Sequence, residues 1–291
     1  LIGSFVIGVA ATILQVVLNL YLTVCRIGKT TALQRQMIGG TSNSIGMAIA
    51  PLVISYLIFH GTPLHDIVTK QFIIPLIILI LIMLIITILV GKTQMPSIDN
   101  VRQAPGEKFD KSVWSFRNLK LGVWGIFFYV GIEVAVGANV NMYASELGGS
   151  FASNATHMAA LYWGLLLLGR FLGSFIKQVP SEKQLVIASI GAIVLLVLAM
   201  LTANPWILTL IGFFHSIMWP AIFTLATDQL GKYTTKASGV LTMGVIGGGI
   251  IPLLQGIFAD VMGGNWLWTW LLVIAGEAYI LYYGLNGYKQ H

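Results

Sequence analysis

Two acidic residues, Glu133 and Glu277, lie within long apolar stretches of the sequence. An ionised carboxylate is costly in an apolar medium, so such a residue should face a polar interior, accept hydrogen bonds or carry a proton. Glu133 lies near the middle of the stretch 119–145, whereas we expect Glu277 to lie nearer the periphery. Glu133 is therefore the stronger candidate for a functional acid. The alternative is a permanently protonated or hydrogen-bonded Glu that only braces a ligand or a neighbouring helix.

Neutral polar side chains and aromatic rings recur in the same apolar stretches. Gln15 and Asn19 are one helical turn apart and share a face, and Asn139 lies near the face of Glu133. Such amides, hydroxyls and aromatic rings can line a ligand-binding cavity, although amides also form hydrogen bonds between membrane helices. His215 lies near Pro220, which can kink a helix. The candidate substrate-binding residues are Gln15, Asn19, Asn43, Tyr129, Asn139, Tyr162, Trp163, His215 and Gln255.

A pair of opposite charges is predicted at the cytoplasmic ends of two apolar stretches. Arg170 and Asp228 are placed where a direct or water-bridged contact could close a gate. The alternative is that Arg170 extends to the lipid headgroups. Gly169 and Gly173 form a GxxxG step beside it, which favours close helix packing over ligand contact.

The elements that must position these residues are membrane-spanning helices. Hydrophobic residues make up 57% of the 291 residues and charged residues only 9%, against about 25% charged in a soluble domain. A single soluble core and a transmembrane barrel are excluded, because the apolar blocks are near the length of about 20 residues that a spanning helix needs and lack alternation. The predicted spans are 3–25, 36–59, 71–91, 119–145, 157–176, 184–203, 205–228, 235–259 and 266–287.

Positive charges set the expected orientation. With the N-terminus outside, every Lys and Arg except Lys70 lies on the cytoplasmic side, and so does the C-terminus. The formal net charge of +6 therefore reflects membrane topology, and no nucleic-acid partner is expected. Cys25 is the one cysteine, which excludes a disulfide within the chain, a CxxC motif and a cysteine metal site.

An internal repeat organises the spans into domains. Residues 45–52 (IGMAIAPL) match residues 246–253 (IGGGIIPL) at Ile, Gly, Ile, Pro and Leu, which aligns Pro51 with Pro252. Spans one to three therefore correspond to spans seven to nine, and spans four to six lack a partner unless three helices precede Leu1. We expect an incomplete helical half at 1–91, a cytoplasmic linker at 92–118 and a six-helix half at 119–291. The alternative is a native nine-span fold with chance similarity.

Several motifs together resemble one subgroup of the major facilitator superfamily, that of the fucose:proton symporters and glucose/galactose permeases. They are Leu14-Gln15 with Asn19, Arg35 with Ser42 to Gly46, Phe127 to Ala135, Tyr162-Trp163-Gly164, Gly169-Arg170-Phe171, Ser216 to Phe223 and Gly247 to Gln255. The resemblance implies an all-α, twelve-helix integral membrane fold, of which nine helices are present here. It also implies alternating-access uptake of a hexose or deoxyhexose coupled to protons. Gln15 stands where fucose-type members have a membrane-embedded Glu, which leaves Glu133 as the acid best placed to couple proton movement to sugar binding.

The resemblance also implies the setting in which the chain works. We expect a multi-pass monomer in the bacterial inner membrane, with a small sugar as substrate, a proton or Na⁺ as coupling ion, the lipid bilayer as surroundings and no cofactor. Efflux of an amphipathic drug or metabolite is one alternative, and a non-functional fragment of a permease is another. A membrane enzyme is not expected, since the sequence contains no HExxH, GxSxG or Walker pattern and its histidines are scattered.

Overall fold

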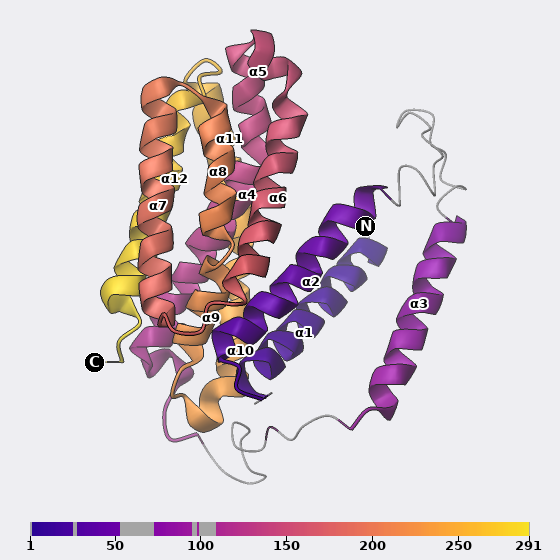
Figure 1. Ribbon diagram of the computed structural model, residues 1–291. Coiled ribbons are helices and arrows are strands. Elements are labelled where there is room, and N and C mark those ends of the chain that lie inside the picture. The colour runs from indigo at the N-terminus through magenta and orange to yellow at the C-terminus, as the bar shows by residue number, and fades with distance from the viewer. Residues whose placement is uncertain (1, 26–27, 53–72, 95–97, 99–108, 291) are drawn as a thin grey trace. The chain divides into compact units, whose positions relative to one another are not determined.

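The computed structural model describes residues 2–25, 28–52, 73–94, 98 and 109–290, and these residues form helices joined by short turns (Figure 1). The chain divides into two compact units. The larger unit comprises Leu1–Thr41 and Ile98–His291, and the smaller unit comprises Ser42–Ser97. The all-α membrane fold predicted from the sequence is confirmed by this helical architecture.

The larger unit contains nine α-helices after residue 98 in the described part of the chain, together with α1 and the first half of α2. Their bounds are α1 Ile2–Val24, α2 Ala32–Leu52, α4 Arg117–Leu147, α5 Gly149–Ser153, α6 Ala155–Gly173, α7 Ser181–Thr202, α8 Pro205–His215, α9 Met218–Thr227, α10 Thr234–Thr242, α11 Gly247–Val261 and α12 Trp270–Tyr282. Short 3-10 turns lie at Val113–Ser115, Gly231–Tyr233, Met243–Ile246 and Leu267–Thr269, and a π-helical turn follows α12 at Tyr283–Gly287.

Six helical segments of the described residues are long and apolar enough to cross a membrane. They are Phe5–Val24, Ile73–Lys92, Arg117–Leu147, Ser181–Thr202, Pro205–Thr227 and Gly231–Val261. The remaining predicted spans are represented by α2, α6 and α12, although the end of the predicted span 36–59 lies outside the described residues. Residues 95–97 and 99–108 of the predicted linker 92–118 also lie outside them, so the domain boundaries stay a prediction.

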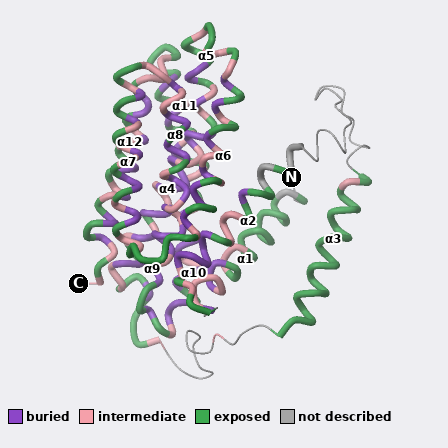
Figure 2. The backbone as a smooth tube through the Cα atoms, viewed as in Figure 1, coloured by how far each residue is buried: buried purple, intermediate pink, exposed green. Residues whose placement is uncertain are grey.

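Helix α4 is the central element of the larger unit, and it packs against α6, α8, α9, α11 and α12. Buried residues concentrate on these helices (Figure 2). Glycines allow the closest approach: a Cβ at Gly247 would meet the backbone carbonyl of Phe127 on α4, and one at Gly244 would lie 2.6 Å from the carbonyl oxygen of Val123. Since real Cβ atoms do not approach so closely, α4 can meet the 3-10 turn Met243–Ile246 and the start of α11 only through glycine.

Glycines also allow α6 and α8 to approach each other closely. A Cβ at Gly169 would lie 2.7 Å from the carbonyl oxygen of Phe213, and one at Gly212 would meet the carbonyl oxygen of Tyr162. Gly169 therefore serves helix packing, as its GxxxG spacing predicted.

The span 205–227 is interrupted in its middle. Helix α8 begins with Pro205 after Asn204, whose side chain accepts a hydrogen bond from the Trp206 backbone N–H, and it ends at His215. Helix α9 starts only at Met218. Pro220 has no N–H to donate to the carbonyl of Ser216, which removes one helical hydrogen bond at the break. The irregularity predicted from Pro220 is therefore present, and it places His215 at a helix end inside the bundle.

The smaller unit contains the second half of α2 and helix α3, Ile73–Lys92. The α3 segment has a mean hydropathy of 3.5, and none of its residues is buried. A helix that is apolar on all sides requires a lipid environment or apolar neighbours. Pro51, predicted to align with Pro252, has a side chain outside the described residues, so the repeat stays a prediction.

Candidate functional site

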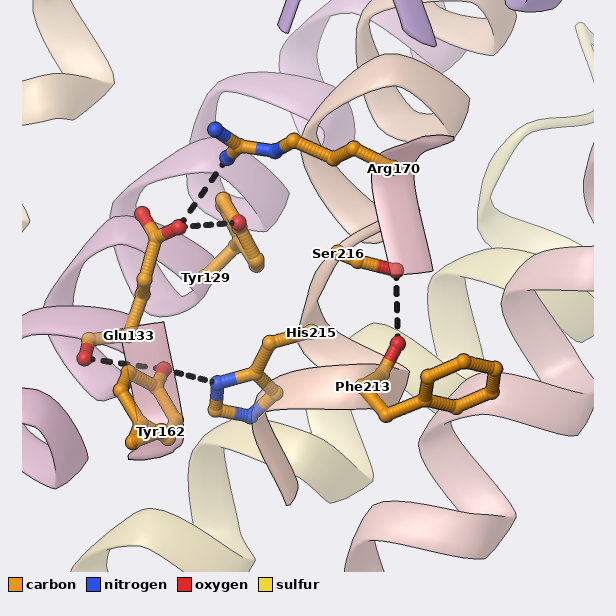
Figure 3. Close-up of polar contacts among 7 residues, drawn as sticks. All are labelled: Tyr129, Glu133, Tyr162, Arg170, Phe213, His215 and Ser216. Atoms are coloured by element: carbon orange, nitrogen blue, oxygen red, sulfur yellow. Dashed lines mark hydrogen bonds and ion pairs between the residues drawn. The ribbon is translucent and has the colours of Figure 1, made fainter. Parts of the chain in front are cut away.

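One carboxylate oxygen of Glu133 accepts two hydrogen bonds, one from a hydroxyl and one from a guanidinium. The hydroxyl of Tyr129 donates to Oε1 at 2.7 Å, and Nη2 of Arg170 lies 3.2 Å from the same oxygen (Figure 3). The side chains of Arg170 and Glu133 are 10% and 13% exposed. The acid is therefore held as the partner of a largely buried guanidinium.

Local sequence and helix packing both build this contact. Tyr129 precedes Glu133 by one helical turn on α4, which puts the two side chains on one face. Arg170 comes from the last turn of α6, and its aliphatic stem passes Gly40 of α2, where a Cβ would lie 3.2 Å from the Arg170 Cδ. The ion pair thus ties α4 to α6 beside the first half of α2.

A second polar chain is fully buried between α6, α8 and α12. The Tyr162 hydroxyl donates to the backbone carbonyl of Glu133 at 3.1 Å and lies 2.7 Å from Nδ1 of His215. On the other side of the ring, Nε2 of His215 lies 2.6 Å from Oε1 of Glu277. His215 and Glu277 side chains are both 0% exposed. The break between α8 and α9 brings the imidazole to the point where these three helices meet.

A third polar group links α4, α11 and the turn before α12. The Asn139 side-chain amide donates to Oε1 of Gln255 at 2.9 Å, and Nε2 of Gln255 donates to the hydroxyl of Thr269 at 3.1 Å. Gln255 and Thr269 are buried, whereas Asn139 is half-buried. The two amides and the Thr269 hydroxyl therefore form a continuous chain of hydrogen bonds.

The structure brings together most of the residues predicted on the C-terminal helices, but not all of the predicted set. Trp163 is half-buried and packs edge-on against Tyr162, with ring centroids 5.1 Å apart. On α1, Gln15 is half-buried and Asn19 is buried, with the Asn19 backbone carbonyl accepting from Nε2 of Gln36 at 2.8 Å. Asn43 is exposed within the smaller unit.

The predicted neighbours of Glu133 were Gln15, Asn19 or His215. Of these, His215 is connected to Glu133 through the Tyr162 hydroxyl, which contacts the Glu133 backbone and not its carboxylate. Substrate contact by any of the predicted residues stays a prediction.

The predicted gate pair of Arg170 and Asp228 stays a prediction. Arg170 contacts the Glu133 carboxylate, with Nη2 3.2 Å from Oε1. Asp228 caps the end of α9 with an exposed side chain, and its backbone carbonyl accepts from Asn118 and Gln290. The contact between Arg170 and Glu133 was not predicted, and it pairs a carboxylate that would be costly if it were buried alone.

Sequence reasoning also underrated Glu277, which was expected near the periphery and is completely buried. The available signal was an acid and a histidine in two different apolar stretches, because each is costly alone and the two satisfy each other when paired. Thr269 was missed as well, and its hydroxyl carries no distinguishing sequence signal.

Metal binding was not expected from the sequence. In the part of the chain that the structure describes, no three His, Cys, Asp or Glu side chains lie close enough together to hold a metal ion.

Comparisons with known proteins give a consistent result. The family model described as "Major Facilitator Superfamily" matches residues 1–252. The "Glucose/galactose transporter" of Brucella abortus biovar 1 is 35% identical over 98% of this chain and 71% of its own length. The "L-fucose-proton symporter" of Escherichia coli is 26% identical over 90% of this chain and 66% of its own length.

The fold is also found among solved structures. A crystal structure of the transporter FucP in the outward conformation superposes with a TM-score of 0.79 at 23% identity, covering 94% of this chain and 72% of that one. This likeness concerns the helical fold.

Proposed function

Because the chain belongs to the major facilitator superfamily, we propose that it transports a hexose or deoxyhexose across the membrane by alternating access, coupled to protons. The observation that carries the substrate class is the 35% identity to a glucose/galactose transporter across 98% of the chain. Proton coupling draws support from the similarity to an L-fucose-proton symporter and from a carboxylate held inside the helical bundle.

Glu133 is the proposed coupling residue. Its carboxylate contacts Arg170 and the Tyr129 hydroxyl, so binding a proton removes the attraction to Arg170 and weakens the contact between α4 and α6. A proton would then alter helix packing beside the substrate site. This is the linkage that proton-driven transport requires, because one ligand must change the free energy of the conformations that the other ligand sees.

The proposed sugar site consists of polar and aromatic residues from α4, α6 and α11. Asn139 and Gln255 supply amide donors and acceptors, and the phenol rings of Tyr129 and Tyr162 supply hydroxyls. Trp163, beside Tyr162, offers an aromatic face for a sugar ring. Gln15 and Asn19 are proposed to contact the sugar from α1, and a sugar contact by Asn43 stays a prediction from the sequence.

The proposal also covers the setting of the protein. The chain is a multi-pass membrane protein. We propose that it is a monomer in the bacterial inner membrane with its C-terminus in the cytoplasm, because this orientation puts every Lys and Arg except Lys70 on the cytoplasmic side. A cysteine introduced at Gln290 should then react with impermeant reagents only from the inner face. Labelling from outside would contradict the orientation.

The test of transport uses the protein expressed from its whole reading frame and reconstituted in proteoliposomes. Labelled glucose, galactose and fucose are offered with and without an inward proton gradient. We expect concentrative uptake with the gradient, and a Glu133→Gln variant that exchanges sugar across the membrane but no longer accumulates it. Glu182→Gln, in the first turn of α7, is the matched control and should accumulate sugar like wild type.

Three results would contradict the proposal. Absence of sugar movement in any form would favour a non-transporting chain. Outward movement of amphipathic compounds without sugar uptake would favour an efflux transporter. Full accumulation by Glu133→Gln would remove the coupling role of Glu133 while leaving sugar transport in place.

A further inference from the structure

The buried pair of His215 and Glu277 is separate from the Glu133–Arg170 contact and has no assigned role in the proposed transport step. The Nε2 to Oε1 distance is 2.6 Å, and neither side chain is exposed. The other oxygen of Glu277, Oε2, is also buried and has no hydrogen-bond partner among the described residues. A full carboxylate charge with one bare oxygen is unfavourable in such surroundings unless a proton compensates it.

The hydrogen bonds of Tyr162 and His215 depend on each other. A tyrosine hydroxyl has a single hydrogen, and two acceptors lie within its reach: the backbone carbonyl oxygen of Glu133 at 3.1 Å and Nδ1 of His215 at 2.7 Å. When the hydroxyl donates to the carbonyl, it cannot also donate to Nδ1. The contact with Nδ1 is then a hydrogen bond only if Nδ1 carries a hydrogen and donates it to the Tyr162 oxygen.

The contact on the other side of the ring needs a second proton. With Nδ1 protonated, a neutral imidazole has a lone pair at Nε2, which would face a lone pair of an ionised Glu277 at 2.6 Å. The contact is attractive only when one proton lies between the two atoms, on Nε2 or on Oε1. In both cases the pair has no net charge, and it holds one proton more than a neutral histidine beside a carboxylate.

We propose that His215 and Glu277 form a second proton-binding site, whose occupancy sets the direction of the Tyr162 hydroxyl. When the site is occupied, Tyr162 donates to the Glu133 carbonyl and links α6 to α4. When one proton leaves to solvent, the remaining imidazole proton must lie on Nε2 facing the Glu277 carboxylate. Nδ1 then becomes an acceptor, the Tyr162 hydroxyl turns to it, and the hydrogen bond to α4 is lost.

The ionisable groups around the pair are consistent with a site that relies on its own proton. Helix α4 contributes Tyr129, whose ring lies 6.1 Å from that of His215, and Glu133. Helix α6 contributes Tyr162 and Arg170, of which Arg170 contacts the Glu133 carboxylate. Helix α7 carries ionisable side chains only in its first turn, at Glu182 and Lys183, and α9 carries none. On α12 itself the other ionisable groups are Tyr279 and Tyr282.

The experiment reads the two imidazole nitrogens directly and does not depend on transport. His215 is made the sole histidine by replacing the others with Gln, and the protein with ¹⁵N-labelled histidine is studied by NMR in lipid nanodiscs. The infrared absorption of protonated carboxyl groups is recorded on the same sample, on Glu277→Gln and on Glu133→Gln. The histidines replaced are His60, His65, His157 and His291.

At neutral pH we expect one of two supporting results. His215 is protonated on both nitrogens, or it is protonated on Nδ1 alone while a protonated-carboxyl band is present that Glu277→Gln removes and Glu133→Gln keeps. Raising the pH should convert His215 to the form protonated on Nε2 alone. A His215 protonated only on Nε2 at neutral pH, with no carboxyl band that depends on Glu277, would overturn the proposal.

Discussion

Replacing Arg170 with Met tests how strongly the Glu133 contact holds α4 to α6. The substitution keeps a long apolar side chain beside Gly40 but removes the guanidinium that lies 3.2 Å from Glu133. Because both side chains are at most 13% exposed, Glu133 is left as a poorly solvated charge.

The expected loss of stability can be estimated from these contacts. Removing one partner of a buried ion pair costs about 3–5 kcal/mol. The Tyr129 hydroxyl still donates to Glu133 at 2.7 Å, so the lower end of that range, about 3 kcal/mol, applies. For a chain of this size each kcal/mol shifts the unfolding temperature by about 2–4 °C, which gives a decrease of ~6–12 °C.

The assay is thermal unfolding of the purified protein in one detergent, with Lys177→Met as the control. Lys177 is exposed after the end of α6, and its replacement should change the unfolding temperature by less than ~2 °C. The double variant Arg170→Met with Glu133→Gln removes both charges and should be more stable than Arg170→Met alone. Equal unfolding temperatures for Arg170→Met and Lys177→Met, or strictly additive effects in the double variant, would refute the reasoning.

Two further predictions concern helix packing and the end of the linker. Gly247→Ala should lower the free energy of unfolding by about 1–3 kcal/mol, because the added Cβ meets the Phe127 carbonyl. Gly249→Ala is the control and should leave it unchanged, because a Cβ there meets open space. Equal shifts in the unfolding temperature of the two variants would contradict this. Tyr233→Phe removes a hydroxyl that accepts from the backbone N–H of Lys111 at 3.2 Å, so trypsin should cleave after Lys111 about tenfold faster, for a loss of ~1.4 kcal/mol. An unchanged cleavage rate would show that this contact does not hold the segment.

The helices were largely predictable because length and hydropathy decide them. The predicted span 119–145 is observed as α4, Arg117–Leu147, and the predicted span 184–203 as α7, Ser181–Thr202. Interruptions within the spans were harder to predict. Pro220 indicated the break in the span 205–227, but the 3-10 turn Met243–Ile246 inside the next span follows no proline. Close packing of Gly244 and Gly247 against α4 accompanies it, and packing partners cannot be read from a single helix.

The candidate site was predictable only where it is local. The contact between Tyr129 and Glu133 follows from their spacing of one turn on the same helix. The partners of Arg170 and Glu277 depend instead on how neighbouring helices are rotated and how deep each residue lies. His215 and Glu277 are 62 residues apart in the sequence, and the histidine reaches the acid because α8 ends where it does.

The break between α8 and α9 also has a mechanical consequence. An uninterrupted hydrogen-bond ladder makes a span behave as one stiff rod, so a tilt imposed at one end is carried to the other. Here the span consists of two shorter helices, separated at Ser216 and Ile217. Helix α8 is hydrogen-bonded to α6 and α12 through His215, while α9 packs against α4. A change in the tilt of one helix therefore does not require breaking the backbone hydrogen bonds within the other.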